Sequence, residues 1–535
     1  MRSLRSVYAF AVIVFLAASG TAQQRWYETA RLLPELGFHD QLHGAALALD
    51  GDTALVGAPV AWGPIGGSFG AGSVRVFVRQ GGEWSQEAEL DTPFKFNGGN
   101  FGGAVALDGD TAVIGLPALN GSGTLLQGGV AVFVRSAGTW VYEASFLAPD
   151  PQPTTQRFGA AVAVSGDTMV VGAPDADEGP TMGPGAVYIF TRSAGVWTQQ
   201  ARLLSPQPQQ HAAFGTDLDL EGDTLLVGEP YASPAAHLTS SGAARVFTRS
   251  AGVWSFDQTL LSLDAAAWDS AGSVALSGDR AVLGSPGALG PGELTTFVRQ
   301  GGTWVADELL FDLVYNGKGR SVDISGDTVV TGTLAFIAEG QRPGAVLYDA
   351  EPSGWQQQPV AWSRDGFTGA ENNYESAVFE LDGDTLLVGV PNHDGSAEEA
   401  GMVHVFTRDG PWADHEHALK GTSFQPPLLY AAGSLGSASG NELLLAGIPG
   451  GGAAYIVASA TDLSVPFKGG VLVPAPDVIL GPVALPDAIG EALSLPFHMP
   501  VVVPSGFTFY MQYWFADAGA PQGFAASNAL SGTTP

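Results

Sequence analysis

The side chains best placed for chemistry are carboxylates in a loop that follows an apolar segment. Asp175, Asp177 and Glu178 lie within one short stretch beside Gly179. Three carboxylates next to a glycine could hold a hard cation such as Ca²⁺, which takes oxygen ligands. A solvated acidic loop is the alternative interpretation. A second candidate is the pair His415 and His417, whose spacing suits zinc, but a polar outer strand is the preferred interpretation of this pair.

Three tryptophans stand outside the regular pattern of the chain and could form a binding surface. They are Trp62, Trp268 and Trp362. Exposed aromatic rings in loops can stack on sugars or anchor a protein partner, although the same rings could also fill a core. Gly66–Gly70 matches the nucleophile-elbow pattern Gly-x-Ser-x-Gly, but it lies in a glycine-rich loop without the required strand-turn-helix context. No carboxylate pair stands out for glycoside cleavage, so we predict no catalytic residues.

These loops are carried by a repeat. In its clearest copy a Gly-Asp turn at Gly166-Asp167 precedes an apolar strand from Thr168, which ends in Gly172-Ala173-Pro174. The turn glycines recur at 51, 109, 166, 222, 278, 326, 383 and 440, in steps of 58, 57, 56, 56, 48, 57 and 57 residues. A nearly constant period of this size indicates a solenoid, a propeller or an array.

Each repeat predicts four strands, of which the second is apolar on both faces. Strands apolar on both faces must be covered on both faces, as in the stacked four-stranded blades of a propeller. An open β-solenoid is the structural alternative. The acidic residue of the turn recurs in seven copies, which indicates a structural role in capping turn N–H groups. These residues are Asp52, Asp110, Asp167, Asp223, Asp279, Asp327 and Asp384.

The repeat count predicts how the ring closes. Each unit is followed by a strand that begins with tryptophan, but the chain also starts with such a strand, Trp26–Leu33, and the last unit (430–457) lacks one. The N-terminal strand is therefore expected to complete that last unit. The arithmetic gives eight blades, and the short fifth-to-sixth step and the degenerate last copy leave seven as the alternative.

Composition supports an all-β protein that works outside the cytoplasm. The 535 residues include 73 glycines and 35 prolines, only 14% are charged, and there is no cysteine. Residues 1–22 have the basic start, apolar run and small-residue end of a signal peptide, so we expect cleavage near Ala22 and a secreted or cell-surface protein without a membrane span. The net charge of −31 disfavours nucleic acid as a partner.

The period stops near residue 460. Residues 461–535 contain strand-like runs separated by prolines and are expected to form a small β-sandwich-like module. The expected domains are thus a signal peptide at 1–22, the propeller at 23–460 and this module at 461–535.

These motifs resemble the FG-GAP repeats found in integrin α-subunits and in many secreted bacterial proteins. The resemblance rests on Phe158-Gly159, the Gly-Asp turn, Gly172-Ala173-Pro174 and the strand from Gly185 that leads to Trp197. It covers about residues 25–460 and implies a β-propeller whose usual role is recognition or adhesion. Integrin-type repeats often carry a calcium loop, but here a tight hairpin replaces it. We therefore expect no cofactor, with calcium left open elsewhere.

The sequence predicts a non-catalytic extracellular module that binds a protein or a polysaccharide through loops on one propeller face. The loops after each Gly-x-Pro vary while the frame repeats, as expected where a rigid scaffold carries recognition loops. A polysaccharide hydrolase or lyase is one alternative, which acidic or histidine side chains converging in the central channel would favour. A structural surface or matrix component is the other.

Overall fold

The computed structural model describes most of the chain as strands and turns, with no helix among the residues it describes. These are 26–33, 42–60, 71–93, 99–119, 126–235, 238–287, 292–310, 319–337, 340–358, 360–362, 377–391 and 401–408, followed by the strand backbones between 412 and 533. The predicted signal peptide lies outside them. No helix in the described part of the chain is long and apolar enough to cross a membrane.

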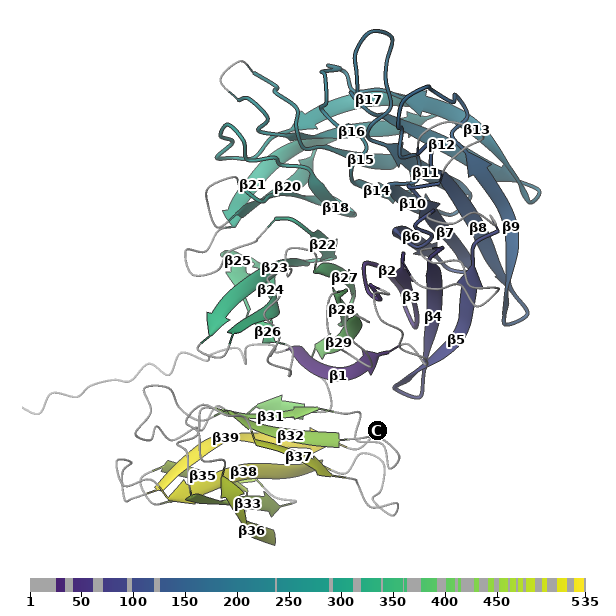
Figure 1. Cartoon of the computed structure of the whole chain (residues 1–535). Helices are drawn as coiled ribbons and strands as arrows, with labels where there is room; N and C mark the ends of the chain where they lie inside the picture. Colours follow the sequence, from purple (N-terminus) through teal and green to yellow (C-terminus); the bar gives the residue numbers. More distant parts are fainter. Residues whose placement is uncertain are drawn as a thin grey trace, which may run out of the picture.

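Seven four-stranded antiparallel blades form a ring around a central channel (Figure 1). In six of them the chain runs from the innermost strand to the outermost. The first three blades are β2 (Ala46–Asp50), β3 (Thr53–Ala58), β4 (Ser73–Gln80) and β5 (Glu83–Asp91); β6 (Ala104–Asp108), β7 (Thr111–Leu116), β8 (Gly129–Ser136) and β9 (Thr139–Leu147); β10 (Ala161–Ser165), β11 (Thr168–Ala173), β12 (Ala186–Ser193) and β13 (Val196–Leu203).

Blades 4 to 6 continue in the same order. They are β14 (Leu218–Glu221), β15 (Thr224–Glu229), β16 (Ala243–Ser250) and β17 (Val253–Leu260); β18 (Ser273–Ser277), β19 (Arg280–Ser285), β20 (Glu293–Gln300) and β21 (Thr303–Leu310); β22 (Val322–Ser325), β23 (Thr328–Ile337), β24 (Gly340–Glu351) and β25 (Gly354–Gln357), with the short β26 (Ala361–Trp362) also paired to β24.

The seventh blade closes the ring with the N-terminal strand. It contains β27 (Val378–Asp382), β28 (Thr385–Val390) and β29 (Met402–Arg408), and its outer strand is β1 (Trp26–Leu32). Antiparallel pairing runs from Trp26↔Arg408 to Leu32↔Val403. Closure by the N-terminal strand is confirmed, and seven is the lower of the two predicted counts.

The partner of that strand differs from the prediction. We expected β1 to complete the unit at 430–457, whereas it completes the preceding unit. The strands of the later unit, β31 (Leu428–Ala432) and β32 (Asn441–Ala446), pair with each other, and β32 pairs with β37 (Leu493–Phe497). The eighth repeat therefore finds its partner strand in the tail of the chain.

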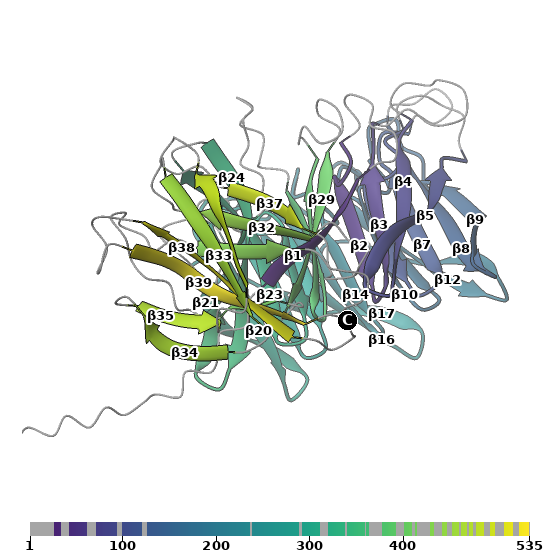
Figure 2. The ribbon, with the colours of Figure 1, turned by 90° about the horizontal axis from the view of Figure 1, so that it is seen from below.

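The remaining C-terminal strands form two further sheets. β30 (Trp412–Asp414), β39 (Phe524–Thr533), β38 (Thr508–Ala516), β33 (Gly452–Ser459) and β36 (Val478–Leu485) form one, while β34 (Asp462–Phe467) and β35 (Gly470–Pro474) form the other. Figures 1 and 2 show these strands beside the ring. The domain boundary near 460 stays a prediction.

Close contact between glycines of neighbouring blades explains two elements of the repeat. A Cβ atom at Gly172 of β11 would lie 2.1 Å from the carbonyl oxygen of Gly215, which precedes the next blade. Only glycine permits this approach, and Gly215 also has a φ of +89°. The same contact recurs around the ring between Gly57 and Gly102, Gly115 and Gly159, Gly228 and Gly272, Gly284 and Gly319, and Gly389 and Gly44.

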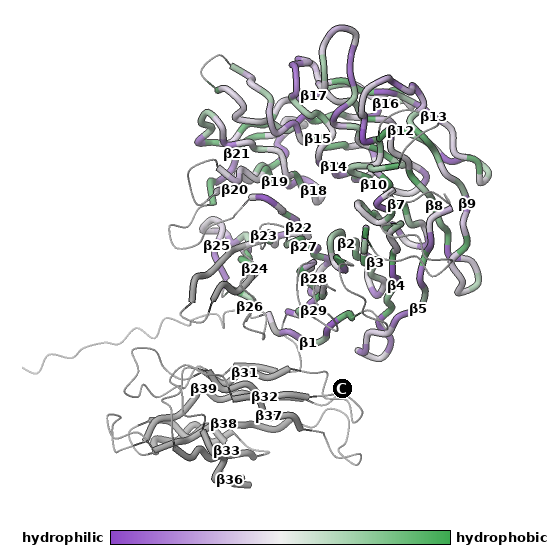
Figure 3. The backbone as a smooth tube through the Cα atoms, viewed as in Figure 1, coloured by the Kyte–Doolittle hydropathy of each residue, from purple (hydrophilic) through white to green (hydrophobic). Residues whose placement is uncertain are grey.

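The phenylalanine before the second of these glycines fills the space between blades. Phe101, Phe158 and Phe214 are fully buried. Phe158 packs edge-to-face on Tyr188 and Phe190 of its own blade, and its cluster includes Val113 and Val130 of the preceding blade. Burying a side chain of this size contributes roughly 1.5–3 kcal/mol. The blades thus share their cores, whereas the outer strand β5 alternates exposed and half-buried positions over most of its length. Figure 3, coloured by hydropathy, shows both hydrophilic and hydrophobic residues along β5.

Candidate functional site

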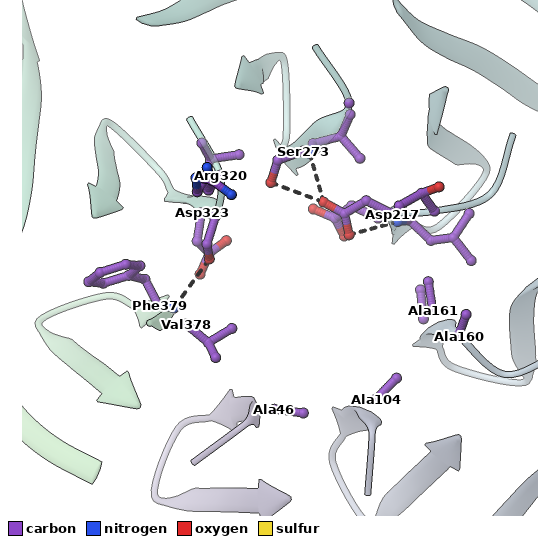
Figure 4. Close-up of a pocket in the computed structure, with 18 of the residues that line it drawn as sticks. Ala46, Ala104, Ala160, Ala161, Asp217, Ser273, Arg320, Asp323, Val378 and Phe379 are labelled. Atoms are coloured by element: carbon purple, nitrogen blue, oxygen red, sulfur yellow. Dashed lines mark hydrogen bonds between the residues drawn. The ribbon is translucent and has the colours of Figure 1, made fainter. Parts of the chain in front are cut away.

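The innermost strands of the seven blades surround a cavity of about 860 Å³. On one side β2, β6 and β10 contribute small side chains, including Ala46, Ala104 and Ala161 (Figure 4). On the other side β14, β18 and β22 contribute polar side chains, and Figure 4 shows Asp217 beside Ser273, with Asp323 across the cavity. The channel is therefore chemically asymmetric although the frame is nearly seven-fold.

Three carboxyls occupy the same place in their blades, three residues before the turn glycine. They are Asp219 on β14, Asp323 on β22 and Glu380 on β27. Each accepts a backbone N–H from the inner strand of the following blade. The donors are Leu276 for Asp219 at 2.6 Å, Leu381 for Asp323 at 2.6 Å, and Leu49 for Glu380. These carboxyls therefore link neighbouring blades at the wall of the channel.

A fourth carboxyl lies nearer the end of the channel. Asp217 accepts the N–H of Val274 at 2.9 Å and the hydroxyl of Ser273 at 3.2 Å. It thus makes the same kind of link between the fourth and fifth blades.

The protonation of these carboxyls is shifted upward. Burial raises the pKa of Asp219 to about 7, and the neighbouring Asp217 adds to the shift. Burial and the charge of Asp219 raise the pKa of Asp323 to about 8. Burial, followed by the charges of Asp323 and Asp219, raises the pKa of Glu380, and burial raises that of Asp217. Like charges that share one cavity cannot all ionise without mutual repulsion.

Two exposed aromatic residues line the same cavity. Trp268 has 58% of its surface exposed and Tyr231 has 53%. The Trp268 backbone has a φ of +74°, and its N–H donates to Thr239 at 2.8 Å. His211 in the preceding blade has a similar φ of +57° and an equivalent hydrogen bond. The frame thus fixes this backbone position, and the fifth blade places an indole there.

The other two predicted binding tryptophans are not placed at this site. Trp62 lies outside the described residues. Trp362 belongs to β26, where it pairs with Gly344 of β24, and its side chain lies outside the described part of the structure.

The predicted cation loop has protein partners for each carboxylate. Asp175 pairs with Arg157 at 2.5 Å, and Glu178 pairs with Arg202 at 2.7 Å. Asp177 accepts the N–H of Gly183 at 2.8 Å and also a hydroxyl hydrogen bond from a neighbouring loop. Among the described residues no three acidic or histidine side chains are grouped in a way that could hold a metal ion.

The turn aspartates belong to a repeated stack of three side chains. Asp167 pairs with Arg192 at 2.7 Å, and the guanidinium lies 5.0 Å from the centre of the Trp197 ring. The backbone N–H of Arg192 also donates to the backbone carbonyl of Asp167. Equivalent ion pairs join Asp52 to Arg79, Asp110 to Arg135, Asp223 to Arg249 and Asp384 to Arg408, while the backbone carbonyl of Asp279 accepts from Arg299. In the sixth blade Ala350 holds the third-strand position, and Asp327 pairs instead with Arg280 of the preceding blade, which lies over Trp355.

The turn N–H groups are bound by another set of side chains. The backbone N–H of each turn glycine donates to a side-chain oxygen of the previous blade. The acceptor belongs to the residue directly before the turn glycine of that blade. The seven pairs are Gly51 with Asp382, Gly109 with Asp50, Gly166 with Asp108, Gly222 with Ser165, Gly278 with Glu221, Gly326 with Ser277 and Gly383 with Ser325. These hydrogen bonds form a closed ring through all seven blades, so neighbouring blades are fixed at the turn end of the channel.

Sequence reasoning missed the channel carboxyls. Aligning the repeats at the turn glycine places Ala48, Ala106 and Ala163 at the position that Asp219 and Asp323 occupy in other blades. This departure from a small residue to an acid was the signal that could have found them. Tyr231, directly after the Gly-x-Pro of the fourth repeat, was missed as an individual residue.

Comparison with known proteins supports the repeat family. The FG-GAP repeat matches residues 140–190 and 197–247, two adjacent repeats. The chain thus contains FG-GAP repeats, and the seven-bladed ring is consistent with an FG-GAP propeller. No curated protein sequence is significantly similar to the chain.

Solved propellers resemble the chain only distantly. A periplasmic gluconolactonase from Pseudomonas aeruginosa is 16% identical with a TM-score of 0.40, over 59% of this chain and 84% of that one. A putative 6-phosphogluconolactonase from Bacteroides uniformis is 11% identical with a TM-score of 0.42, over 67% and 92%. The β-propeller domain of the Trilobed protease from Pyrococcus furiosus is 10% identical with a TM-score of 0.41, over 72% and 95%. Likeness at this level carries no inference about activity.

Proposed function

We propose that this FG-GAP propeller is a non-catalytic extracellular recognition module that binds a polysaccharide at the channel mouth marked by Trp268 and Tyr231. The observation that carries the proposal is the exposure of both rings on the wall of one cavity. Flat aromatic faces beside hydrogen-bonding groups are suited to sugar rings, which present apolar C–H faces and polar edges. The cavity of about 860 Å³ is within the ordinary range for ligand sites.

Charge narrows the class of polysaccharide. The protein carries a net charge of −31, and the cavity wall contains Asp217, Asp219, Asp323 and Glu380. Anionic chains such as polyuronates would be repelled by this field, whereas neutral or amino-bearing sugars would not. The proposed ligand is therefore a neutral or amino-bearing glycan.

The convergence of acids in the channel is also the feature that would favour a hydrolase. Their hydrogen bonds support the non-catalytic alternative, because Asp219, Asp323 and Glu380 each accept a backbone N–H of the neighbouring blade. A glycosidase needs one carboxyl positioned to protonate the leaving group and another placed as base or nucleophile. The structural role of these carboxyls accounts for their presence without catalysis.

The test is binding of the full chain to a glycan array, followed by calorimetry on any glycan that binds and mass spectrometry of the recovered glycan. Trp268→Ala and Tyr231→Ala should each weaken binding by about 30-fold, the effect of losing an aromatic anchor worth about 2 kcal/mol. Tyr142→Ala is the matched control, because Tyr142 is 48% exposed on the outer strand β9, away from the cavity lining.

Recovery of intact neutral or amino-bearing glycan, with binding sensitive to Trp268 and Tyr231, would support the proposal. Recovery of shortened glycan would replace it with the hydrolase alternative. Absence of glycan binding, or equal loss in the Tyr142→Ala control, would overturn it and direct attention to a protein partner or to self-association.

A further inference from the structure

The links between the inner strands of neighbouring blades are of two kinds. We call the joints in which a channel carboxyl binds the next blade the acidic joints. They lie between blades 4 and 5 through Asp219, between blades 6 and 7 through Asp323, and between blades 7 and 1 through Glu380. At the joints between blades 1 and 2, 2 and 3, 3 and 4, and 5 and 6, alanine occupies the equivalent position, so the acidic joints are three of the four joints from blade 4 round to blade 1.

One of these joints lies where the ring closes and therefore bears on the stability of the whole ring. The last of them joins the blade that β1 completes to the first blade, so it lies where the ring closes. An inner strand has one edge without a partner strand, and side chains of the preceding blade bind its N–H groups. At an acidic joint that side chain can change its charge, whereas alanine cannot.

We propose that the acidic joints form a proton-dependent clasp, which holds the arc from blade 4 through the closure to blade 1 when protonated and loosens it when ionised. A protonated carboxyl still accepts the backbone N–H through its carbonyl oxygen, so protonation removes repulsion without breaking the link. Ionisation of all three places negative charges in one cavity, where each disfavours the others. Only the acidic arc should respond, because the alanine joints contain nothing that titrates at that position.

The other charged and titratable groups around the cavity are mostly acidic. Arg320 is the one cationic side chain among the described residues that line the cavity. The remaining groups that line it or carry a shift-causing charge are acidic or weakly acidic: Asp217, Glu221, Asp269 and Tyr231. Asp50 and Asp382, at the ends of β2 and β27, bind turn N–H groups. The acidic joints therefore face more negative than positive charge.

The direction of the pH effect follows from linkage. Burial raises the pKa of Asp219 in the folded protein from its ordinary 3.8 to about 7. The unfolded chain therefore releases this proton first, and the fold loses stability as pH rises above 3.8, until the folded group has also ionised. Between pH 6 and pH 8 such a carboxyl raises the unfolding equilibrium about tenfold. Asp323, with its pKa at about 8, acts in the same direction.

Hydrogen exchange of the full chain at pH 6 and pH 8, corrected for the intrinsic exchange rate, tests the clasp. We expect the protection of β18, β27–β29 and β1 to fall from pH 6 to pH 8, while that of β6–β9 and β10–β13 stays constant. In Asp323→Asn and Glu380→Gln the fall should be smaller, because an amide keeps the acceptor oxygen and cannot ionise. Asp108→Asn is the matched control, because Asp108 makes a similar N–H link at the solvent-exposed turn end.

Three results would overturn the proposal. Equal loss of protection in both arcs would show that pH acts on the whole ring rather than on the acidic joints. Unchanged pH dependence in Asp323→Asn and Glu380→Gln would remove these carboxyls as the cause. If those variants fail to fold, Asp219→Asn and the comparison of the two arcs in the unaltered chain decide the matter, and protection of the acidic arc that rises or stays constant at pH 8 refutes the clasp.

Discussion

Replacing Gly172 by alanine should disrupt the contact between the third and fourth blades. The added Cβ would lie 2.1 Å from the carbonyl oxygen of Gly215, whereas ordinary van der Waals contact begins at 3.4 Å. Backbone must therefore move by about 1.3 Å, the difference between these two distances. Inserting even one carbon into a packed core typically costs 1–3 kcal/mol, and here the obstacle is main chain rather than a side chain. We expect Gly172→Ala to lower the free energy of unfolding by about 3 kcal/mol or more.

Gly166→Ala is the control for this substitution. Gly166 has a φ of +56°, but a Cβ there meets no atom within 4 Å. The control therefore measures the penalty of the left-handed backbone alone, about 1 kcal/mol. Both variants should be compared by urea unfolding followed by tryptophan fluorescence, with the slope of the transition checked for constancy. If Gly172→Ala is no more destabilising than Gly166→Ala, steric contact between blades is not the reason for this glycine.

Three further substitutions test other contacts of the ring, each by urea unfolding. Arg192→Ala removes the ion pairs with Asp167 and Glu143 and the stacking on Trp197, so we expect the free energy of unfolding to fall by about 1 kcal/mol, and Arg192→Lys should restore only part of it. Glu229→Ala leaves the fully buried guanidinium of Arg245 without the carboxylate that lies 2.6 Å away, and it should cost about 3–5 kcal/mol; a loss below 1 kcal/mol would contradict this account of the pair. Burial and then the charge of Arg75 lower the pKa of His43 to about 3, so the unfolded chain binds a proton below pH 6.5 that the fold does not, and stability should fall by about 2 kcal/mol between pH 7 and pH 5 from this group. His43→Phe should flatten that slope, and an unchanged slope would exclude His43 as its source.

The blades could be predicted from the sequence because their signals are local. A turn glycine with positive φ, an apolar strand and a Gly-x-Pro end recur within each repeat, so one copy such as Gly166 to Pro174 shows the pattern. The partner of β1 could not be predicted in this way. Trp26 pairs with Arg408 of β29. Repeat spacing does not tell whether β1 pairs with this strand or with the later unit at 430–457.

The turn aspartates show the same limit at the scale of single side chains. Local reasoning assigned Asp167 to the turn itself, whereas its carboxylate binds Arg192 on the third strand of the blade. An arginine precedes most of the tryptophan strands in the sequence, but its partner becomes apparent only when the hairpin places the two side chains together. The channel carboxyls were missed for a different reason. Asp219 and Ala163 hold the same position in their repeats, three residues before the turn glycine. Only the closed ring brings Asp219, Asp323 and Glu380 to one cavity.

Closure of the ring by its first strand sets an order in time for folding during synthesis. The hydrogen bond between Glu28 of β1 and His404 of β29 joins residues separated by 376 positions. At about 5–20 residues per second, a ribosome needs about 20–75 s to make that interval. Throughout this time the strand that will pair with β1, which is β29, has not yet been synthesised, although blades 1 to 6 can already form. The nascent chain therefore exposes one unpaired strand for longer than any other in the ring, and that strand is the natural place for a chaperone to act.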